Sequence, residues 1–248
     1  MPLVSYVLLS LLGASNMILW GVYADLLMEK FSIKKVLRSL AVGVFAGIYL
    51  YLANETLPPI IVVFSAIAIE RFTTEVYKNV IREETQEKYL IPSTMSLPFP
   101  SLTRRVLGLF VLAVAFLAFK YIRFDFHFLV IYLMAIVPAI TGALKDAPHE
   151  GFSILKFFRL PLVVLVMGIL INKAFPTLED KYLLLAMGGG ERVISECYKK
   201  IIRAKVPGKF KVDNIRKPNK EWESKRKYIL VPYFFSLIAI TAAAIYSL

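Results

Sequence analysis

Long uncharged apolar stretches, separated by short segments rich in charge, constrain this chain more than any other feature. Hydrophobic residues make up 58% of the 248 residues, whereas an ordinary soluble domain has about 45–50%. The mean hydropathy is +0.64, yet the formal net charge is +12. Such a composition arises when charged residues are kept apart from apolar segments, which is typical of membrane proteins. The sequence therefore predicts an all-α integral membrane protein.

The apolar stretches give about eight predicted transmembrane helices. A helix that crosses the hydrocarbon core needs about 20 residues, and the third and seventh stretches are shorter than that. The sequence leaves open whether these two cross fully. The stretches cover residues 3–24, 39–54, 57–69, 106–119, 128–144, 160–172, 182–190 and 228–247.

The distribution of Lys and Arg predicts the orientation of these helices. If the segments alternate in direction, the polar segments that fall on one side are 25–38, 70–105, 145–159 and 190–227. The basic residues left for the opposite side are Lys120, Arg123, Lys173 and Lys181. Because loops rich in Lys and Arg stay in the cytoplasm, we expect the basic segments there and both termini on the opposite side.

The last basic segment contains a polybasic stretch at residues 203–227. Basic residues beside a membrane are attracted to anionic lipid headgroups by about 1 kcal/mol each. We therefore expect the lipid bilayer, and its anionic headgroups at 203–227, to be partners of the chain. Nucleic acid is a less favoured partner, because the membrane topology already accounts for the charge.

The sequence also matches itself at a shift of 121 positions, without a gap through the first 82 residues. The matching positions are mostly polar, whereas the apolar stretches between them match poorly in identity. Apolar side chains that face lipid are interchangeable, so two copies of one unit diverge there first. The match predicts two tandem four-helix repeats, residues 1–121 and 122–248. Copies with an even number of crossings are related by a pseudo-two-fold axis along the membrane normal.

One matched set of polar residues lies in a helix that we expect from about residue 58 through 88. Its charged members recur at spacings of four, three and four residues, so they share one helix face. Too few apolar residues precede them to span the membrane, and ionisable residues at that depth mark functional sites. Ordinary ion pairs along a cytoplasmic helix are the structural alternative. The predicted ligand or pathway residues are Glu70, Arg71, Glu75, Tyr77, Lys78 and Arg82, with Glu191, Arg192, Glu196, Tyr198, Lys199 and Arg203 in the second copy.

Three glycines, Gly188 to Gly190, stand immediately before Glu191 in the second copy. Glycine destabilises a helix interior, and its missing Cβ lets another backbone come close. The glycines therefore predict either a helix break or a close approach of two backbones. They do not form a phosphate-binding loop, because no Gly-Lys-Ser/Thr follows them.

The other matched set ends the first helix of each predicted repeat. Asp25 and Glu29 are one helical turn apart, and two carboxylates on one face can hold a divalent cation. Ion pairing with the basic residues that follow is the alternative. The residues of this possible metal or ion-pair set are Asp25, Glu29, Lys35, Arg38, Asp146, Glu150, Lys156 and Arg159.

Carboxylates, tyrosines and basic groups that occur twice along the chain suit an ion or an anionic or phosphorylated ligand. The leading hypothesis is a membrane transporter or channel with a pseudo-symmetric polar pathway between the repeats. The alternative is a membrane enzyme that acts on a phosphorylated lipid or isoprenoid at the cytoplasmic interface. A non-catalytic scaffold and assembly into a homo-oligomer also stay open.

Overall fold

The computed structural model is helical in every element that it describes. It describes residues 1–28, 30–82, 99–121, 129, 131–137, 140, 154–198 and 219–248. The helices are α1 (Leu3–Asp25), α2 (Ile33–Ala53), α3 (Pro59–Val76), η1 (Tyr77–Ile81), α4 (Ser101–Tyr121), α6 (Ile154–Ala174), α7 (Asp180–Cys197), α8 (Lys220–Lys225), η4 (Arg226–Ile229) and α9 (Leu230–Ser247). Residues 131–137 are helical as well.

Five of these helical segments are long and apolar enough to cross a membrane, among the residues that the structure describes. They are α1, α2, α4, residues 157–174 of α6, and residues 220–247, which run from α8 through α9. This finding indicates a multi-pass membrane protein. The segments correspond to five of the predicted crossings, and the predicted crossing at 128–144 is described only in part.

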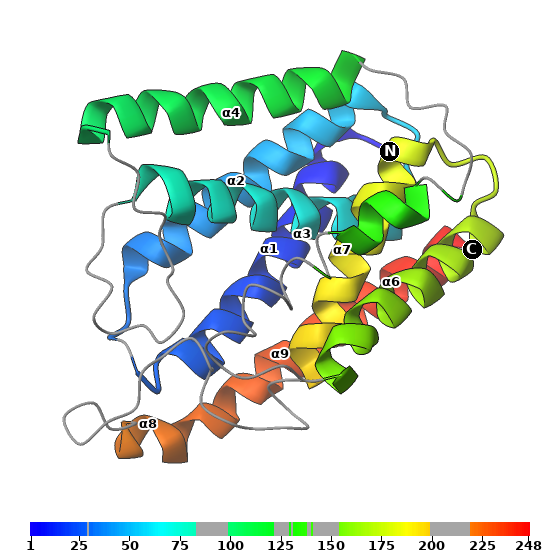
Figure 1. The fold of residues 1–248 in the computed structure, drawn as a ribbon. Helices are drawn as coiled ribbons and strands as arrows, with labels where there is room; N and C mark the ends of the chain where they lie inside the picture. The colour runs from blue at the N-terminus through cyan, green and yellow to red at the C-terminus, as the bar shows by residue number, and fades with distance from the viewer. Residues whose placement is uncertain are drawn as a thin grey trace.

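The third and seventh predicted crossings correspond to α3 and α7, which lie in the interior of the helix assembly (Figure 1). Helix α3 packs against α1, α2, α4, α7 and α9, and α7 packs against α3 and α6. On α3, Ile61 and Ile67 are fully buried, as are Tyr182 and Met187 on α7. Neighbouring helices therefore cover α3 and α7, which explains how both carry charged residues on short apolar stretches.

The end of α3 corrects the predicted length of that helix. Pro59 opens α3 at a position where a missing backbone N–H leaves nothing unsatisfied. A π-helical turn, η1, continues the helix to Ile81, and Arg82 then adopts an extended backbone conformation. The helix therefore ends at Ile81 instead of continuing to about residue 88, and residues 83–98 lie outside the described part.

The three glycines of α7 do not break the helix, which is continuous from Asp180 to Cys197. They bring two backbones together, which is the other outcome that the sequence predicts. A Cβ built on Gly189 would overlap the carbonyl group of Phe64 on α3, and one on Gly190 would overlap the side chain of Met167. A Cβ on Gly188 would meet nothing. Gly189 therefore marks the crossing point of α3 and α7.

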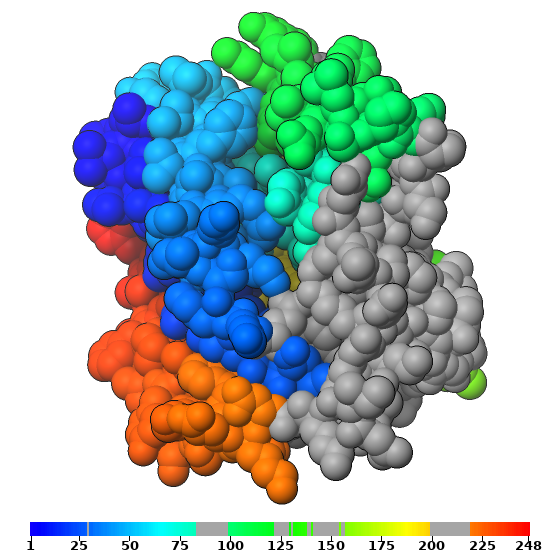
Figure 2. All heavy atoms as spheres, turned by 90° about the vertical axis from the view of Figure 1, so that its left-hand side faces the viewer, coloured from blue at the N-terminus to red at the C-terminus, as the bar shows by residue number. Residues whose placement is uncertain are grey.

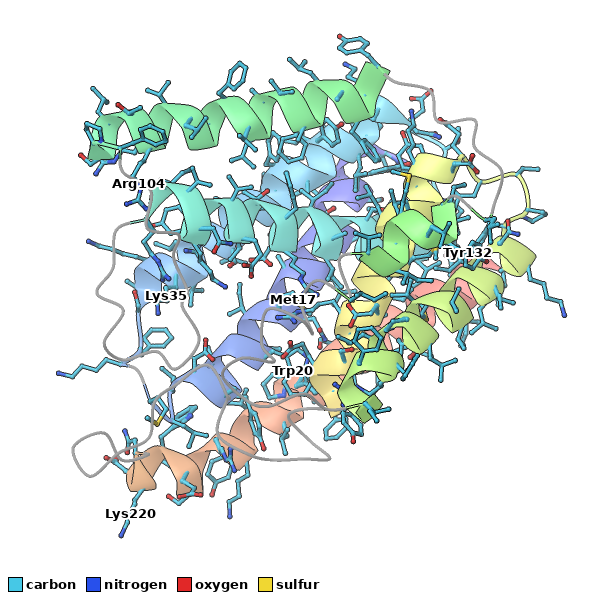
Figure 3. All side chains as sticks on the ribbon, viewed as in Figure 1. Met17, Trp20, Lys35, Arg104, Tyr132 and Lys220 are labelled. Atoms are coloured by element: carbon cyan, nitrogen blue, oxygen red, sulfur yellow. The ribbon has the colours of Figure 1, made fainter. Side chains whose placement is uncertain are left out.

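Both chain termini lie at one end of the helix assembly (Figure 1). The amino group of Met1 donates to the carbonyl oxygen of Glu55 at 3.2 Å, and the N–H of Ile60 donates to Ser247 Oγ at 3.0 Å. The opposite end holds several basic side chains, among them Lys35, Arg104 and Lys220 (Figure 3).

Candidate functional site

An ion pair joins the two interior helices a short way beyond their crossing point. Arg71 Nη1 on α3 lies 3.4 Å from Glu191 Oε2 on α7. The Glu191 side chain is only 9% exposed, whereas that of Arg71 is 44% exposed. The pair therefore links the buried carboxylate of Glu191 to the guanidinium group of Arg71, which is partly exposed.

Hydroxyl groups hold the two matched carboxylates in place. Ser39 Oγ and Thr74 Oγ1 donate to Glu70 Oε1 at 2.8 and 3.0 Å. Ser195 Oγ donates to Glu191 Oε1 at 2.5 Å. Hydrogen bonds to an ionised carboxylate are among the stronger ones in proteins, so both glutamates are fixed in position. All of these side chains come from α2, α3 and α7.

Arg192 adds a second cation beside this pair. Its Nη1 lies 2.5 Å from Glu196 Oε1, one turn further along α7. The two guanidinium groups of Arg71 and Arg192 are near enough to repel each other, and the surrounding carboxylates attract both. We call this group the α3–α7 charge cluster; its members are Glu70, Arg71, Glu75, Glu191, Arg192 and Glu196.

The two matched tyrosines each lie under an arginine. The guanidinium carbon of Arg38 lies 4.7 Å from the ring centroid of Tyr77, and that of Arg159 lies 4.5 Å from the ring of Tyr198. Sequence reasoning placed these arginines in the other polar set, paired with carboxylates. The structure places both arginines over the tyrosines, and the predicted pairing with carboxylates stays a prediction, because Glu29, Asp146 and Glu150 lie outside the described residues. The shift of 121 positions relates both partners of one pair to those of the other, and this is the signal that could have found them.

Two outer members of the predicted site, Lys78 and Arg82, lie at the edge of the α3–α7 charge cluster or beyond it. Lys78 Nζ lies 3.6 Å from Glu75 Oε1 on the exposed side of the helix. Arg82 follows η1, and its carbonyl oxygen accepts a hydrogen bond from Arg104 Nη2 at 3.1 Å. Arg104 Nε also donates to the carbonyl oxygen of Val80 at 3.0 Å. Arg104 is buried and secures the end of η1 against α4, a role that sequence reasoning missed (Figure 3).

A second group of buried polar and aromatic side chains lies between α1 and α9, and it was not predicted from the sequence. Asn16 Nδ2 donates to Ser236 Oγ at 2.8 Å, and the rings of Trp20 and Tyr233 lie 4.0 Å apart between centroids (Figure 3 labels Trp20). These side chains stand 220 and 213 positions apart in sequence, so no local pattern connects them. They hold the first helix against the last.

Several predicted site residues lie outside the described part of the chain: Glu29, Asp146, Glu150, Lys199 and Arg203. The backbone of Lys156 is helical, but its side chain is likewise outside the description. Among the described residues, no group of three or more His, Cys, Asp and Glu side chains could hold a metal ion. The divalent-cation hypothesis stays a prediction, because most of its carboxylates are in the part that is not described.

The fold and the site define a class: a multi-pass helical membrane protein whose two interior helices share a cluster of ionised side chains. Comparison with models of protein families, with curated proteins and with solved structures gives no match to this chain.

Proposed function

We propose that this protein is a membrane transporter or channel with a polar pathway beside the α3–α7 charge cluster. The pathway would conduct an ion or an anionic or phosphorylated solute. The observation that carries the proposal is the ion pair between Arg71 and Glu191, which joins the two interior helices at 3.4 Å. Charged groups inside a helical membrane protein are costly, and they are retained where ions or substrates pass.

The tandem-repeat organisation is part of this proposal. Helices α2 and α6 have 21 residues each, and α3 and α7 have 18 each. Each second helix starts 121 positions after the first, and the arginine–tyrosine pairs are related by the same shift. These correspondences favour two four-helix units around a pseudo-two-fold axis along the membrane normal.

The sidedness of the membrane follows from the same reasoning. Both termini would lie outside, and the end with Lys35, Arg104 and Lys220 would face the cytoplasm, where basic loops accumulate. The stretch 203–227, of which residues 219–227 are described, would lie against anionic headgroups there.

An exchange of ion-pair partners would gate the pathway. In the described arrangement Arg71 reaches across to the other helix, while Arg192 pairs with Glu196 on its own helix. The pseudo-two-fold axis relates this arrangement to a second one. In the second arrangement Arg192 would pair with Glu70 on the other helix, and Arg71 would pair with Glu75 on its own helix. Both arrangements pair an arginine with a glutamate on the other helix, so a bound solute that favours one of them would select between them.

Flux through proteoliposomes tests the proposal. The purified chain would be reconstituted and assayed with potassium, chloride and inorganic phosphate as separate probes. We expect flux of at least one probe, and a loss of about tenfold or more in both Arg71→Gln and Arg192→Gln, since each removes one cation of the gate. Arg105→Gln is the matched control, because Arg105 is an exposed arginine on α4. Absence of flux for all three probes, or equal flux in all variants, would count against transport.

The membrane-enzyme alternative predicts a different pattern. An enzyme needs one asymmetric chemical site, whereas a gate shared by two repeats needs both. Glu70→Gln and Glu191→Gln therefore separate the two functions in an assay of flux and of turnover of a phosphorylated isoprenoid. Similar loss of flux in both variants favours transport, and loss of turnover confined to one variant favours catalysis.

A further inference from the structure

A groove on the membrane-facing side of the molecule lies between α2, α3 and α4. Its volume is about 430 Å³, which is within the range of small-molecule sites, about 300–1,000 Å³. Apolar side chains form most of its wall, among them Val42 and Phe45 from α2 and Leu112 and Phe116 from α4. Figure 2 shows α2 and α4 side by side on one face of the molecule. Both helices are candidate membrane spans, so the groove opens where lipid would be.

Two polar side chains line the same groove, Arg38 from α2 and Thr73 from α3. Arg38 Nε and Thr73 Oγ1 are both buried, and neither has a hydrogen-bond partner. A buried donor without an acceptor is unfavourable, and a ligand oxygen would relieve it. The stacking of Arg38 on Tyr77 at 4.7 Å holds the guanidinium group at this place. The wall of the groove therefore includes two residues that each carry a buried donor without a hydrogen-bond partner, beside apolar side chains.

This groove is separate from the α3–α7 charge cluster. Arg71 and Thr73 are two positions apart on α3, which places them about 200° apart around the helix. Arg71 contacts α7, whereas Thr73 lines the groove towards α2 and α4. A ligand in the groove would therefore bind outside the proposed pathway.

We propose that the groove binds one anionic lipid. A phosphate oxygen of the headgroup would accept hydrogen bonds from Arg38 and Thr73, and an acyl chain would lie along the apolar wall. Arginine suits phosphate oxygens because its planar guanidinium group donates along two parallel directions. On α2 the groove begins at Arg38, about one helical turn after Lys34 and Lys35, and this further positive charge favours an anionic headgroup. A lipid with a zwitterionic headgroup lacks this net charge.

The second half of the chain supplies a matched control. Arg159 is related to Arg38 by the shift of 121 positions, stacks on Tyr198 at 4.5 Å, and also has a buried Nε without a hydrogen-bond partner. The position that corresponds to Thr73 is Ile194, which has no hydroxyl group. If the site needs both donors and the groove, Arg159 does not form a second one.

Native mass spectrometry of the full chain in a neutral detergent tests the lipid site. The protein would be titrated with phosphatidylglycerol and, separately, with phosphatidylcholine of the same acyl chains. We expect phosphatidylglycerol to bind about tenfold tighter, and Arg38→Gln to remove about tenfold of that affinity, as expected for loss of a charge-assisted hydrogen bond. Thr73→Val should weaken binding several-fold, and Arg159→Gln should leave it unchanged.

A variant on the groove wall keeps the test decisive if Arg38→Gln does not fold. Ala113 lines the groove and is exposed on α4, so Ala113→Phe would fill the space without disturbing the interior. Weaker phosphatidylglycerol binding in Ala113→Phe supports the proposal. Equal affinity for both lipids, or an equal effect of Arg159→Gln and Arg38→Gln, would overturn it. Displacement of the lipid by millimolar inorganic phosphate alone would overturn it as well, since the site would then recognise a free anion.

Discussion

Helices α3 and α7 share a Glu-Arg pair, a hydroxyl-bearing residue and a second Glu in the same order, but those residues have different partners. Glu70 on α3 accepts hydrogen bonds from two hydroxyl groups, Thr74 on its own helix and Ser39 on α2. Glu191 on α7 accepts one from Ser195 and pairs with Arg71 on the other interior helix. The position that corresponds to Ser39 is Leu160, which cannot donate. Glu191 therefore lacks the second hydroxyl donor that Glu70 has, and it forms an ion pair with Arg71.

The two helices also differ at their crossing point. Gly189 on α7 corresponds to Ala68 on α3, so only the α7 position lacks a Cβ, and Gly189 lies directly against the backbone carbonyl group of Phe64. The crossing is therefore asymmetric even though the helices have equal lengths.

The largest effect is expected at Gly189. In Gly189→Ala the new methyl group overlaps the Phe64 carbonyl group, and the two backbones must separate. Overpacking of this kind costs about 3 kcal/mol of folding free energy at its upper range. Thermal unfolding in detergent, followed by circular dichroism, should show a clearly lower Tm. Gly188→Ala is the matched control and should be neutral or stabilising by about 0.5–1 kcal/mol, because its Cβ meets nothing. Equal Tm values in both variants would contradict the crossing geometry.

The next effect separates Arg104 from its counterpart, Lys225. Arg104 is buried and donates to two backbone carbonyl groups at the end of η1. Arg104→Ala should cost about 2 kcal/mol, since it leaves buried acceptors without a donor. Lys225 pairs with Glu221 in an exposed position, so Lys225→Ala should leave the unfolding midpoint unchanged. A comparable loss from Lys225→Ala would mean that the two basic residues have equivalent roles.

A smaller effect is expected for the ion pair between the interior helices. A double-mutant cycle of Arg71→Gln and Glu191→Gln should give a coupling energy of about 1 kcal/mol, because the Arg71 side chain is 44% exposed and solvent weakens the attraction. The corresponding cycle of Arg192→Gln and Glu70→Gln should give a smaller coupling energy, because Glu70 ranks below Glu196, Glu191 and Glu75 among the carboxylates that attract Arg192. Equal coupling in both cycles would show that the two arrangements of the gate are populated alike.

The smallest effect concerns the tyrosines under the arginines. Tyr77→Leu and Tyr198→Leu should each lower stability by about 0.5–1 kcal/mol, as a partly exposed cation–π contact does. The two centroid distances are similar, 4.7 and 4.5 Å, so the two losses should agree within error. Thermal unfolding of both single variants and of the double variant measures this. A loss in only one of them would break the correspondence between the halves at this point.

The sequence predicts the helices well where one residue pattern decides them. Apolar length locates α1, α2, α4, α6 and α9, and the polar interruptions at Glu70 and Glu191 single out α3 and α7. The pattern could not tell that these two helices are interior, because short apolar length is equally compatible with a cytoplasmic helix. That distinction depends on which helices surround them.

The residues that meet in the α3–α7 charge cluster all belong to the predicted set, but their pairing could not be predicted from the sequence. The spacing of Arg71 and Glu75 fits an ion pair within one helix, yet Arg71 lies 3.4 Å from Glu191, 120 positions away. The contacts of Arg104 and of Asn16 likewise depend on helix packing across long sequence separations. The spacing of residues along the sequence predicts which residues share a helix face. Which residues that face contacts depends on how the helices pack.

The contact at Gly189 makes the crossing of α3 and α7 a fulcrum. With no side chain between the two backbones at Gly189, a tilt of α7 would be centred on this point. Glu191 lies about 3 Å along the helix axis from the fulcrum and Tyr198 about 13 Å, at 1.5 Å per residue. A tilt that moves Glu191 by about 1 Å would move the end of α7 by roughly 4 Å. The helix would thus convert a change of ion-pair partner into a larger displacement at the basic end of the molecule.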